Sequence, residues 1–278
     1  MHGKHMTTHD ERKAFDSIRT IERQDKPRTQ GVTYARDRGM GLKTLEAALE
    51  GCAEYIDILK LAGFAARLQS RDLIRRKVEM CKQAGVEVGL GGAICEIALL
   101  QGSAAVIAFL DEVRDLGIAY VEVCRAVAIV PVSHLLDLTA LATEYGLKPI
   151  AEVGVAYGIS PDEKVFVDET KLMGTMRRFL DAGAHKILLE SEGITESRHK
   201  EDYRWDVISK IANTFPLERT MFEADDPEVY TRYIRDYGPE VNLFVDISRV
   251  LPLEAARRGG WGMHPIVNRV ATFYRPRS

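Results

Sequence analysis

From residue 30 onward, short apolar runs alternate with longer stretches in which apolar and polar residues are mixed. Each short run is rich in β-branched residues and ends in a polar residue or a glycine, a pattern typical of a buried strand. Eight such runs occur, at residues 31–37, 55–60, 86–92, 119–124, 148–154, 186–190, 220–223 and 241–246. We predict one strand from each run.

The stretches between the runs carry apolar residues at spacings of three and four, which predicts helices. We expect these helices at 42–54, 72–84, 104–116, 135–145, 169–182, 205–213, 227–237 and 252–257. Several end in a glycine directly before the next strand, as at Gly85, Gly117, Gly146 and Gly183, because glycine adopts the left-handed conformation that closes a helix. Eight strand–helix units in about 250 residues predict a single (β/α)₈ TIM barrel. A doubly wound open sheet is the alternative that periodicity leaves open.

The composition is that of a globular protein, since 46% of the 278 residues are hydrophobic and 28% are charged. A net charge of −3 gives no general attraction to nucleic acid or to an anionic membrane. No apolar stretch approaches the roughly 18–20 residues of a membrane span. We therefore expect neither a nucleic-acid nor a membrane partner. A small anionic ligand stays compatible, because a binding site can be basic in a mildly acidic protein.

The four cysteines and the N-terminal segment both indicate a cytoplasmic protein. Cys52, Cys81, Cys95 and Cys124 form no CxxC motif and no zinc-ligand spacing, so we expect reduced thiols. Residues 1–25 are polar and charged, without the apolar run of a secretory signal. Their first six residues look like a cloning remnant. We therefore interpret 1–25 as tag remnant and flexible leader, and 26–278 as the barrel domain.

Charged residues stand at the ends of several predicted strands, and in a barrel these ends share one mouth. An unpaired charge is disfavoured inside a strand, so such residues indicate a function. Crowded carboxylates suit Mg²⁺ binding or general acid–base chemistry. The alternative is that they face outward or form salt bridges with arginines. Alternation along 150–152, 188–190 and 221–223 places each acid on the face of the apolar residue two positions earlier. The candidates are Asp37, Lys60, Glu122, Glu152, Glu190 and Glu223.

Three further features suggest ligand binding. Lys60 is suited to neutralising a phosphate or carboxylate, or to forming a Schiff base, and its structural alternative is an ion pair with Asp37 or Glu96. The pair Gly91-Gly92 would let a ligand approach the backbone closely, although two glycines also make an ordinary turn. The segment 257–262, Arg-Arg-Gly-Gly-Trp-Gly, joins basic charge to glycines. We predict a phosphate-binding loop there, with a helix end as the alternative.

The order and spacing of these residues resemble the phosphosulfolactate synthase family, which includes plant heat-stress-associated relatives. The likeness runs over nearly the whole chain from Lys26. It is carried by Lys26-Pro27-Arg28, Thr33, Asp37-x-Gly39, Tyr55-Ile56-Asp57 with Lys60, Gly91-Gly92 followed by Glu96, Glu122, Glu152-Val153-Gly154, Glu190, Phe222-Glu223-Ala224, Val241-Asn242-Leu243, and Leu253-Glu254 with Arg257-Arg258-Gly259.

The resemblance implies a (β/α)₈ barrel, a homo-oligomer, and Mg²⁺-dependent addition of sulfite to phosphoenolpyruvate. In this Michael-type addition the metal and cations stabilise an enolate, and an acid then protonates the α-carbon. By the same resemblance, the metal ligands would be Glu122, Glu152, Glu190 and Glu223. Substrate contacts would come from Arg28, Asp37, Lys60, Gly91, Gly92, Arg258, Gly259 and Gly260.

The chain departs from the family's pattern at strand ends. The family has a lysine directly after its Glu-Val-Gly triplet, and this chain has Val155-Ala156. The family's Ser-Asp-Gly after the fourth-strand acid is replaced by Cys124-Arg125-Ala126. Arg125 is suited to binding a carboxylate bidentately, and Cys124 is interpreted as a thiol of lowered pKa or as a core thiol. We expect catalysis to involve Lys60, Glu122, Cys124, Arg125 and Glu152.

Three functions are compatible with these features. The first is a divergent Mg²⁺-dependent lyase of the synthase type, which adds sulfite or another nucleophile to phosphoenolpyruvate or a similar enolic acid. The second is an aldolase or isomerase that uses Lys60. The third is a non-catalytic, stress-related interaction protein on the same barrel.

Overall fold

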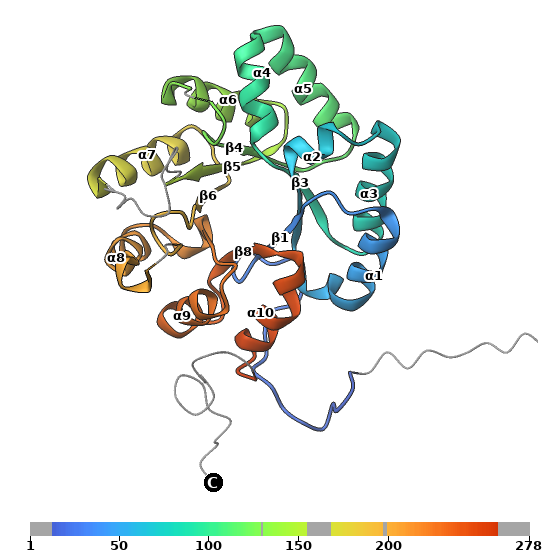
Figure 1. Cartoon of the computed structure of the whole chain (residues 1–278), viewed down its shortest axis with the longest axis vertical. Coiled ribbons are helices and arrows are strands. Elements are labelled where there is room, and N and C mark those ends of the chain that lie inside the picture. The colour runs from blue at the N-terminus through green and yellow to red at the C-terminus, as the bar shows by residue number, and fades with distance from the viewer. Residues whose placement is uncertain (1–12, 129, 155–167, 197–198, 261–278) are drawn as a thin grey trace, which may run out of the picture.

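Eight parallel strands form one closed barrel in chain order, which confirms the predicted (β/α)₈ fold (Figure 1). This computed structural model describes residues 13–128, 130–154, 168–196 and 199–260. Each strand is four to six residues long and lies within a predicted apolar run, except that β2 extends one residue beyond its run. The strands are β1 (Thr33–Asp37), β2 (Ile58–Leu61), β3 (Glu87–Leu90), β4 (Tyr120–Val123), β5 (Lys148–Val153), β6 (Lys186–Leu189), β7 (Thr220–Glu223) and β8 (Asn242–Asp246).

The helices surround the barrel, and every predicted helix is found, with each end within three residues of the predicted one (Figure 1). The structure adds two that the sequence pattern did not predict, α2 and α4, which contact each other near the ends of β2 and β3. The helices are α1 (Leu42–Cys52), α2 (Gly63–Arg67), α3 (Arg71–Gln83), α4 (Ala93–Gln101), α5 (Ser103–Asp115), α6 (Val132–Glu144), α7 (Glu169–Asp181), α8 (Trp205–Thr214), α9 (Pro227–Tyr237) and α10 (Val250–Arg257). Short 3₁₀ turns lie at Ala53–Tyr55, Lys200–Asp202, Leu217–Arg219 and Ile247–Arg249.

The apolar core has two layers, one between the strands and the helices and one inside the barrel. Side chains alternate between the two faces of a strand, so a residue two positions after an inner one also points inward. The inner residues are Val32, Tyr34, Ile58, Tyr120, Ile150, Leu188, Met221 and Phe244. In every strand except β3, a charged residue stands two positions after the last inner residue, namely Arg36, Lys60, Glu122, Glu152, Glu190, Glu223 and Asp246. A layer of charged side chains therefore lies next to the apolar interior of the barrel, toward the C-terminal ends of the strands. We call it the charged layer.

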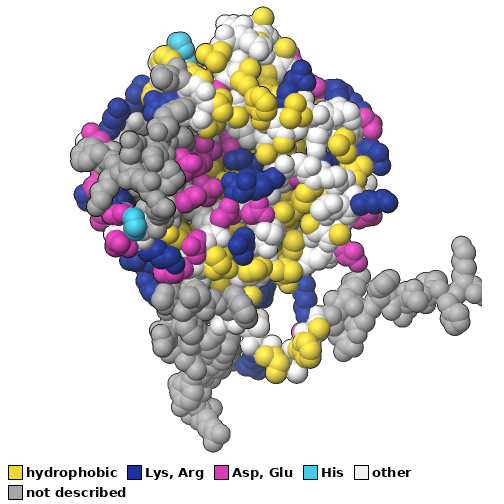
Figure 2. All heavy atoms as spheres, viewed as in Figure 1, with side chains coloured by type: hydrophobic (Ala, Val, Ile, Leu, Met, Phe, Trp, Pro, Cys, Tyr) yellow, Lys and Arg dark blue, Asp and Glu magenta, His cyan; other side chains and the backbone are white. Residues whose placement is uncertain are grey.

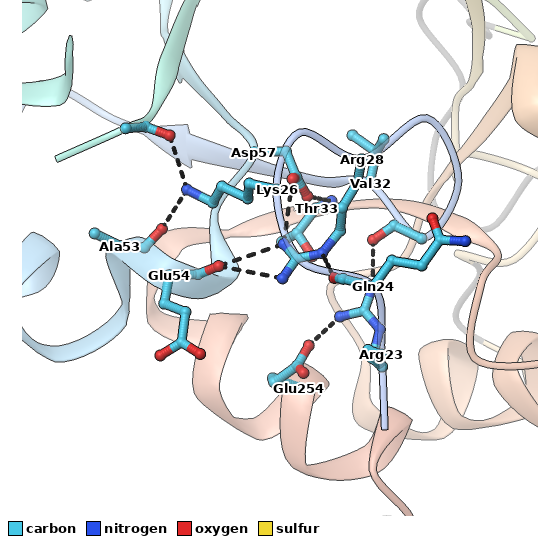
Figure 3. A network of polar contacts seen from close by, with 12 residues as sticks. Arg23, Gln24, Lys26, Arg28, Val32, Thr33, Ala53, Glu54, Asp57 and Glu254 are labelled. Carbon is cyan, nitrogen blue, oxygen red and sulfur yellow. Dashed lines mark hydrogen bonds and ion pairs between the residues drawn. The ribbon is translucent and has the colours of Figure 1, made fainter. Parts of the chain in front are cut away.

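Residues 21–32 cross the N-terminal end of the barrel, and we call this segment the strap. Arg23 is buried in an ion pair with Glu254 of α10, and Lys26 donates to the carbonyls of Ala53 (2.6 Å) and Gly85 (2.9 Å) (Figure 3). Packing thus begins before residue 26, where the sequence placed the start of the barrel domain. The strap closes the end of the barrel that lies opposite the mouth.

Two findings concern the protein's environment. Among the described residues, no helix has both the length and the apolar character needed to cross a membrane. All four cysteines lie in the described part of the chain, where they are buried and unpaired. The expected free thiols are therefore present.

Candidate active site

Lys60, at the end of β2, occupies the centre of the charged layer. Its Nζ lies 2.7 Å from Oε2 of Glu122 and 3.9 Å from Oε2 of Glu152, and 4.4 Å from the ring centroid of Phe244. Burial disfavours the charged amine, but the carboxylates of Glu122 and Glu152 together raise the pKa of Lys60 above its ordinary value. Lys60 is thus a fixed cation rather than a free amine nucleophile. The ion-pair partners predicted for it, Asp37 or Glu96, were wrong.

The other acids of the mouth, Glu152, Glu190 and Glu223, form hydrogen bonds with one another, and not all of them are ionised. Burial and the charge of Glu122 raise the pKa of Glu152 to about 8. Burial, with the charges of Glu152 and Glu223, raises the pKa of Glu190 well above its ordinary value. Burial also opposes ionisation of Glu223, but a hydrogen bond with Glu190 and the nearby cation Arg36 lower its pKa. The protonated Glu190 therefore donates to an ionised Glu223, and the mouth carries less negative charge than its four carboxyl groups suggest.

Arg36 is the second cation of the charged layer, and the sequence analysis missed it. Its Nη1 lies 3.1 Å from Oε1 of Glu223, its Nη2 pairs with Asp225, and its guanidinium lies 5.0 Å from the ring centroid of Phe244. Arg36 also stands in register with Lys60 on the neighbouring strand. The alternation of Val32 and Tyr34, both inside the barrel, was the signal that would have found it.

Asp37, which the sequence analysis placed among the substrate contacts, faces away from the mouth. Its Oδ2 accepts from the buried Lys77 of α3 at 2.8 Å, and its Oδ1 accepts from the backbone amides of Gly39 and Met40. Both carboxylate oxygens are thus occupied. Asp37 fixes the turn after β1 against α3.

A pocket of about 630 Å³ opens at the mouth on the side of β6–β8. Arg36, Arg38, Glu190 and Glu223 line it, together with Ser191, whose hydroxyl lies 3.1 Å from Oε2 of Glu223. On the face shown in Figure 2, basic side chains gather at the centre of the barrel with acidic ones beside them. The pocket therefore offers both charges to a small polar ligand. Arg38 and Ser191 were also missed from the sequence.

Gly91 and Gly92 make room for side chains of the mouth. A Cβ on Gly91 would lie 3.1 Å from Cε of Lys60, and a Cβ on Gly92 would lie 2.4 Å from Sγ of Cys124. The amide of Gly92 also donates to Oε2 of Glu122 at 3.1 Å. The two glycines thus permit the placement of Lys60 and Cys124 and orient Glu122, whereas the sequence analysis had given them a direct ligand contact.

Glu96 at the start of α4 organises the loop after β4. Its carboxylate accepts from Sγ of Cys124 at 2.9 Å and from the backbone amides of Ala126, Val127 and Ala128 at 2.7, 3.0 and 2.8 Å. Burial and the charge of Glu152 raise the pKa of the Cys124 thiol, so its interpretation as a thiol of lowered pKa was wrong. Arg125 stands exposed on this loop.

The residues predicted to bind phosphate lie at the other end of the barrel. Arg28 is held by Asp57 at 3.2 Å on the strap (Figure 3), and Nε of Arg258 lies 2.7 Å from Oε1 of Glu254. Gly259 and Gly260 follow Arg258 after the end of α10, where the backbone of Arg258 accepts from the amide of Ile21. None of these four reaches the mouth. Val155 and Ala156, which depart from the family's pattern, and the end of the glycine-rich segment, 261–262, lie outside the described residues.

The mouth has carboxylate oxygens, which are ligands that suit a hard divalent cation. Glu152, Glu190 and Glu223 are linked by hydrogen bonds, and Oε1 of Glu122 is buried without a partner among the described residues. Carboxylate oxygens are the ligands that Mg²⁺ prefers. As the side chains stand, however, no three acids, histidines or cysteines of the described chain surround a common metal position.

Comparisons with known proteins identify the family and the fold of this chain. The family described as (2R)-phospho-3-sulfolactate synthase (ComA) matches residues 21–263. Protein HEAT-STRESS-ASSOCIATED 32 of Arabidopsis thaliana is 28% identical over an aligned length of 256 residues that covers 85% of this chain and 88% of that protein. Phosphosulfolactate synthase of Methanothermobacter thermautotrophicus is 28% identical over an aligned length of 253 residues that covers 88% of this chain and 95% of that protein. The crystal structure of KGPDC from Streptococcus mutans shares the fold alone, with a TM-score of 0.53 and 10% identity over 82% of this chain and 95% of that one.

Proposed function

We propose, because this chain belongs to the (2R)-phospho-3-sulfolactate synthase family, that it is a lyase-type enzyme that adds sulfite or a similar nucleophile to phosphoenolpyruvate or a related enolic acid. The observation that carries the proposal is the buried Lys60–Glu122–Glu152 centre at the mouth, with Arg36 and Glu190 beside it. Lys60 and Arg36 are fixed cations that could bind an anionic substrate. Glu190 holds a proton that could be transferred to form the product.

The proposed addition forms one bond and moves one proton. The lone pair of the nucleophile bonds to the terminal carbon of the double bond, and the displaced π electrons spread over the α-carbon and its carboxylate. Lys60 and Arg36 stabilise this negative charge from fixed positions, so little reorganisation is needed. Glu190, which holds a proton between Glu152 and Glu223, is our proposed donor to the α-carbon.

Magnesium is part of the proposal. As carboxylates, Glu122, Glu152 and Glu223 would hold the ion, which when bound supplies Lewis-acid stabilisation of the enolate charge, while Glu190 keeps the proton that it donates. The expected calorimetric titration shows Mg²⁺ binding that Glu223→Gln weakens at least about tenfold, since an amide replaces a carboxylate ligand. Equal binding by the two proteins would remove Glu223 from the metal site.

The test of the reaction is phosphorus NMR on a mixture of protein, Mg²⁺, phosphoenolpyruvate and sulfite. We expect a phosphosulfolactate signal that Lys60→Met abolishes and that Lys82→Met, which removes an exposed lysine of α3, leaves unchanged. No adduct with any divalent metal would overturn the sulfite reaction. An adduct formed equally well by Lys60→Met would overturn the role of Lys60.

Two other functions were compatible with the sequence. Schiff-base chemistry at Lys60 is disfavoured, because the raised pKa keeps the amine protonated and paired with Glu122. The similarity to HEAT-STRESS-ASSOCIATED 32 supports a stress-related role, which we proposed from the sequence in a non-catalytic form. A protein that binds neither Mg²⁺ nor phosphoenolpyruvate in calorimetry, yet folds cooperatively, would favour that role.

We also propose a homo-oligomer in the cytoplasm that acts on a small anion, without nucleic-acid or membrane partners. Four unpaired cysteines support a reducing compartment. Exposed large apolar side chains on and beside α2 and α4, namely Phe64, Leu68 and Leu100, support an interface between copies. Light scattering coupled to size exclusion should give a mass above that of one chain, and Leu68→Glu with Leu100→Glu should lower it.

A further inference from the structure

A second pocket, of about 840 Å³, lies at the N-terminal end of the barrel, opposite the mouth. Its walls are the starts of β2–β6 and the strap, part of which Figure 3 shows around Lys26, Arg28 and Asp57. The volume falls within the range of pockets that bind small organic molecules. The function proposed above uses none of these residues.

Positive charge exceeds negative charge in the lining of this pocket. Arg28 pairs with Asp57 at 3.2 Å, and Lys148 pairs with Glu87 at 2.8 Å, so these four charges cancel. The other charged lining residues are the cations Lys26, Lys186 and Arg219 and the carboxylate Glu218. The lining therefore keeps a surplus of two positive charges.

The three remaining cations are held by main-chain carbonyls. Lys26 of the strap donates to the carbonyls of Ala53 and Gly85. Nζ of the buried Lys186 donates to the carbonyls of Thr29 (3.1 Å) and Glu218. Arg219 donates to the carbonyls of Ala184 (2.7 Å) and His185 (3.0 Å). A carbonyl satisfies the hydrogen bond but leaves the charge uncancelled. Accordingly, burial and the charge of Arg219 lower the pKa of Lys186 to about 8.

Half-buried His185 lies among the same excess of positive charges. Burial and the neighbouring cations, Lys186 first, lower the pKa of His185 to about 4. Its ring packs edge-on against Tyr120, 5.6 Å between centroids. An anion in the pocket would relieve the repulsion among these groups, because it would add the negative charge that the lining lacks.

The pocket also has apolar walls, which a free inorganic ion would leave unused. Pro27, Val32, Ile58, Leu147 and Pro149 line it beside the ring of Tyr120. We propose that this pocket is a second binding site, separate from the mouth, for a small organic dianion of the phosphate-ester class. Such a ligand would neutralise the surplus and join the strap to the strands, because Lys26 comes from the strap and Lys186 from β6.

Calorimetry with glucose 6-phosphate as the probe tests the site, with glucose and inorganic phosphate as controls for the sugar and the ion. We expect saturable binding of glucose 6-phosphate, weaker binding of inorganic phosphate and none of glucose. Lys186→Met should lower the affinity at least about tenfold, the effect of losing one hydrogen bond to a charged group. Arg219→Gln, at an exposed position that leaves the core intact, should lower it similarly.

Two variants separate this pocket from the mouth and from the general charge of the protein. Arg36→Gln alters only the mouth, and Lys82→Met removes an exposed lysine on α3, so both should bind the probe as the wild type does. Absence of probe binding at millimolar concentration, or full affinity in both Lys186→Met and Arg219→Gln, would overturn the proposal. So would a loss of affinity in Arg36→Gln alone. The readout is binding, so its failure differs from failure of the reaction.

Discussion

Removing the carboxylate of Glu96 should destabilise the loop that carries Arg125. Glu96 is fully buried and accepts from three backbone amides and one thiol. In Glu96→Ala these donors lose their partner, and each buried unsatisfied amide costs about 1–3 kcal/mol. Since the loop relaxes toward water, we expect a loss of about 3 kcal/mol in unfolding free energy. For a chain of this size, that lowers the Tm by roughly 6–12 °C.

The matched variant Glu96→Gln separates the loss of acceptors from the loss of volume. It keeps one side-chain oxygen and presents an amide group where the other stood, so about half the effect should remain. Glu79→Ala, an exposed glutamate on α3, controls for the loss of a surface acid. Calorimetric melting curves measure all four proteins. If Glu96→Ala melts within about 2 °C of wild type, the carboxylate does not hold the loop and the reasoning is wrong.

Three more predictions concern buried ionisable groups. Because its pKa is raised, Cys124 should resist thiol reagents at pH 8 until urea unfolds the chain, and fast labelling of the folded protein that Cys124→Ser removes would contradict this. The pKa of Glu152 is raised from 4.5 to about 8, so the folded state holds the extra proton between these values and unfolding free energy falls as the pH rises through them. Glu152→Gln should flatten that slope in urea titrations, and an unchanged slope would count against it. Asp37→Asn leaves Lys77 as a buried unpaired charge and should cost about 3–5 kcal/mol by urea unfolding, whereas a loss under about 1 kcal/mol would show that Lys77 finds another partner.

The barrel could be predicted from the sequence because its signal repeats. Each of the eight strands combines an apolar run with a turn before the next helix, so an error in one unit leaves the others intact. The helices α2 and α4 were not predicted, because they lie between a strand and the helix expected after it and leave the order of strands unchanged. Both helices follow a strand, α2 after β2 and α4 after β3, and the strand order of the barrel is the predicted one.

The inner face of the barrel was predictable where an apolar residue precedes the charge by two positions. Ile150, Leu188 and Met221 all lie inside the barrel, as alternation required for Glu152, Glu190 and Glu223. At β1 the same rule selects Arg36 after Tyr34, but Asp37 was chosen because it ends the run. The end of an apolar run indicates where a strand stops. Which way a side chain points depends on whether it lies an even or an odd number of positions from a residue known to point inward.

The misplacement of Arg258, Gly259 and Gly260 has a different physical origin. A phosphate-binding loop at the mouth must lie directly after a strand, whereas these residues follow α10. An eight-residue helix is about 12 Å long and runs antiparallel to the strand before it, so its end lies toward the opposite end of the barrel. The predicted helix at 252–257 already contained this information. Basic composition indicates what a segment can bind, and the order of strand and helix decides which end of the barrel it binds from.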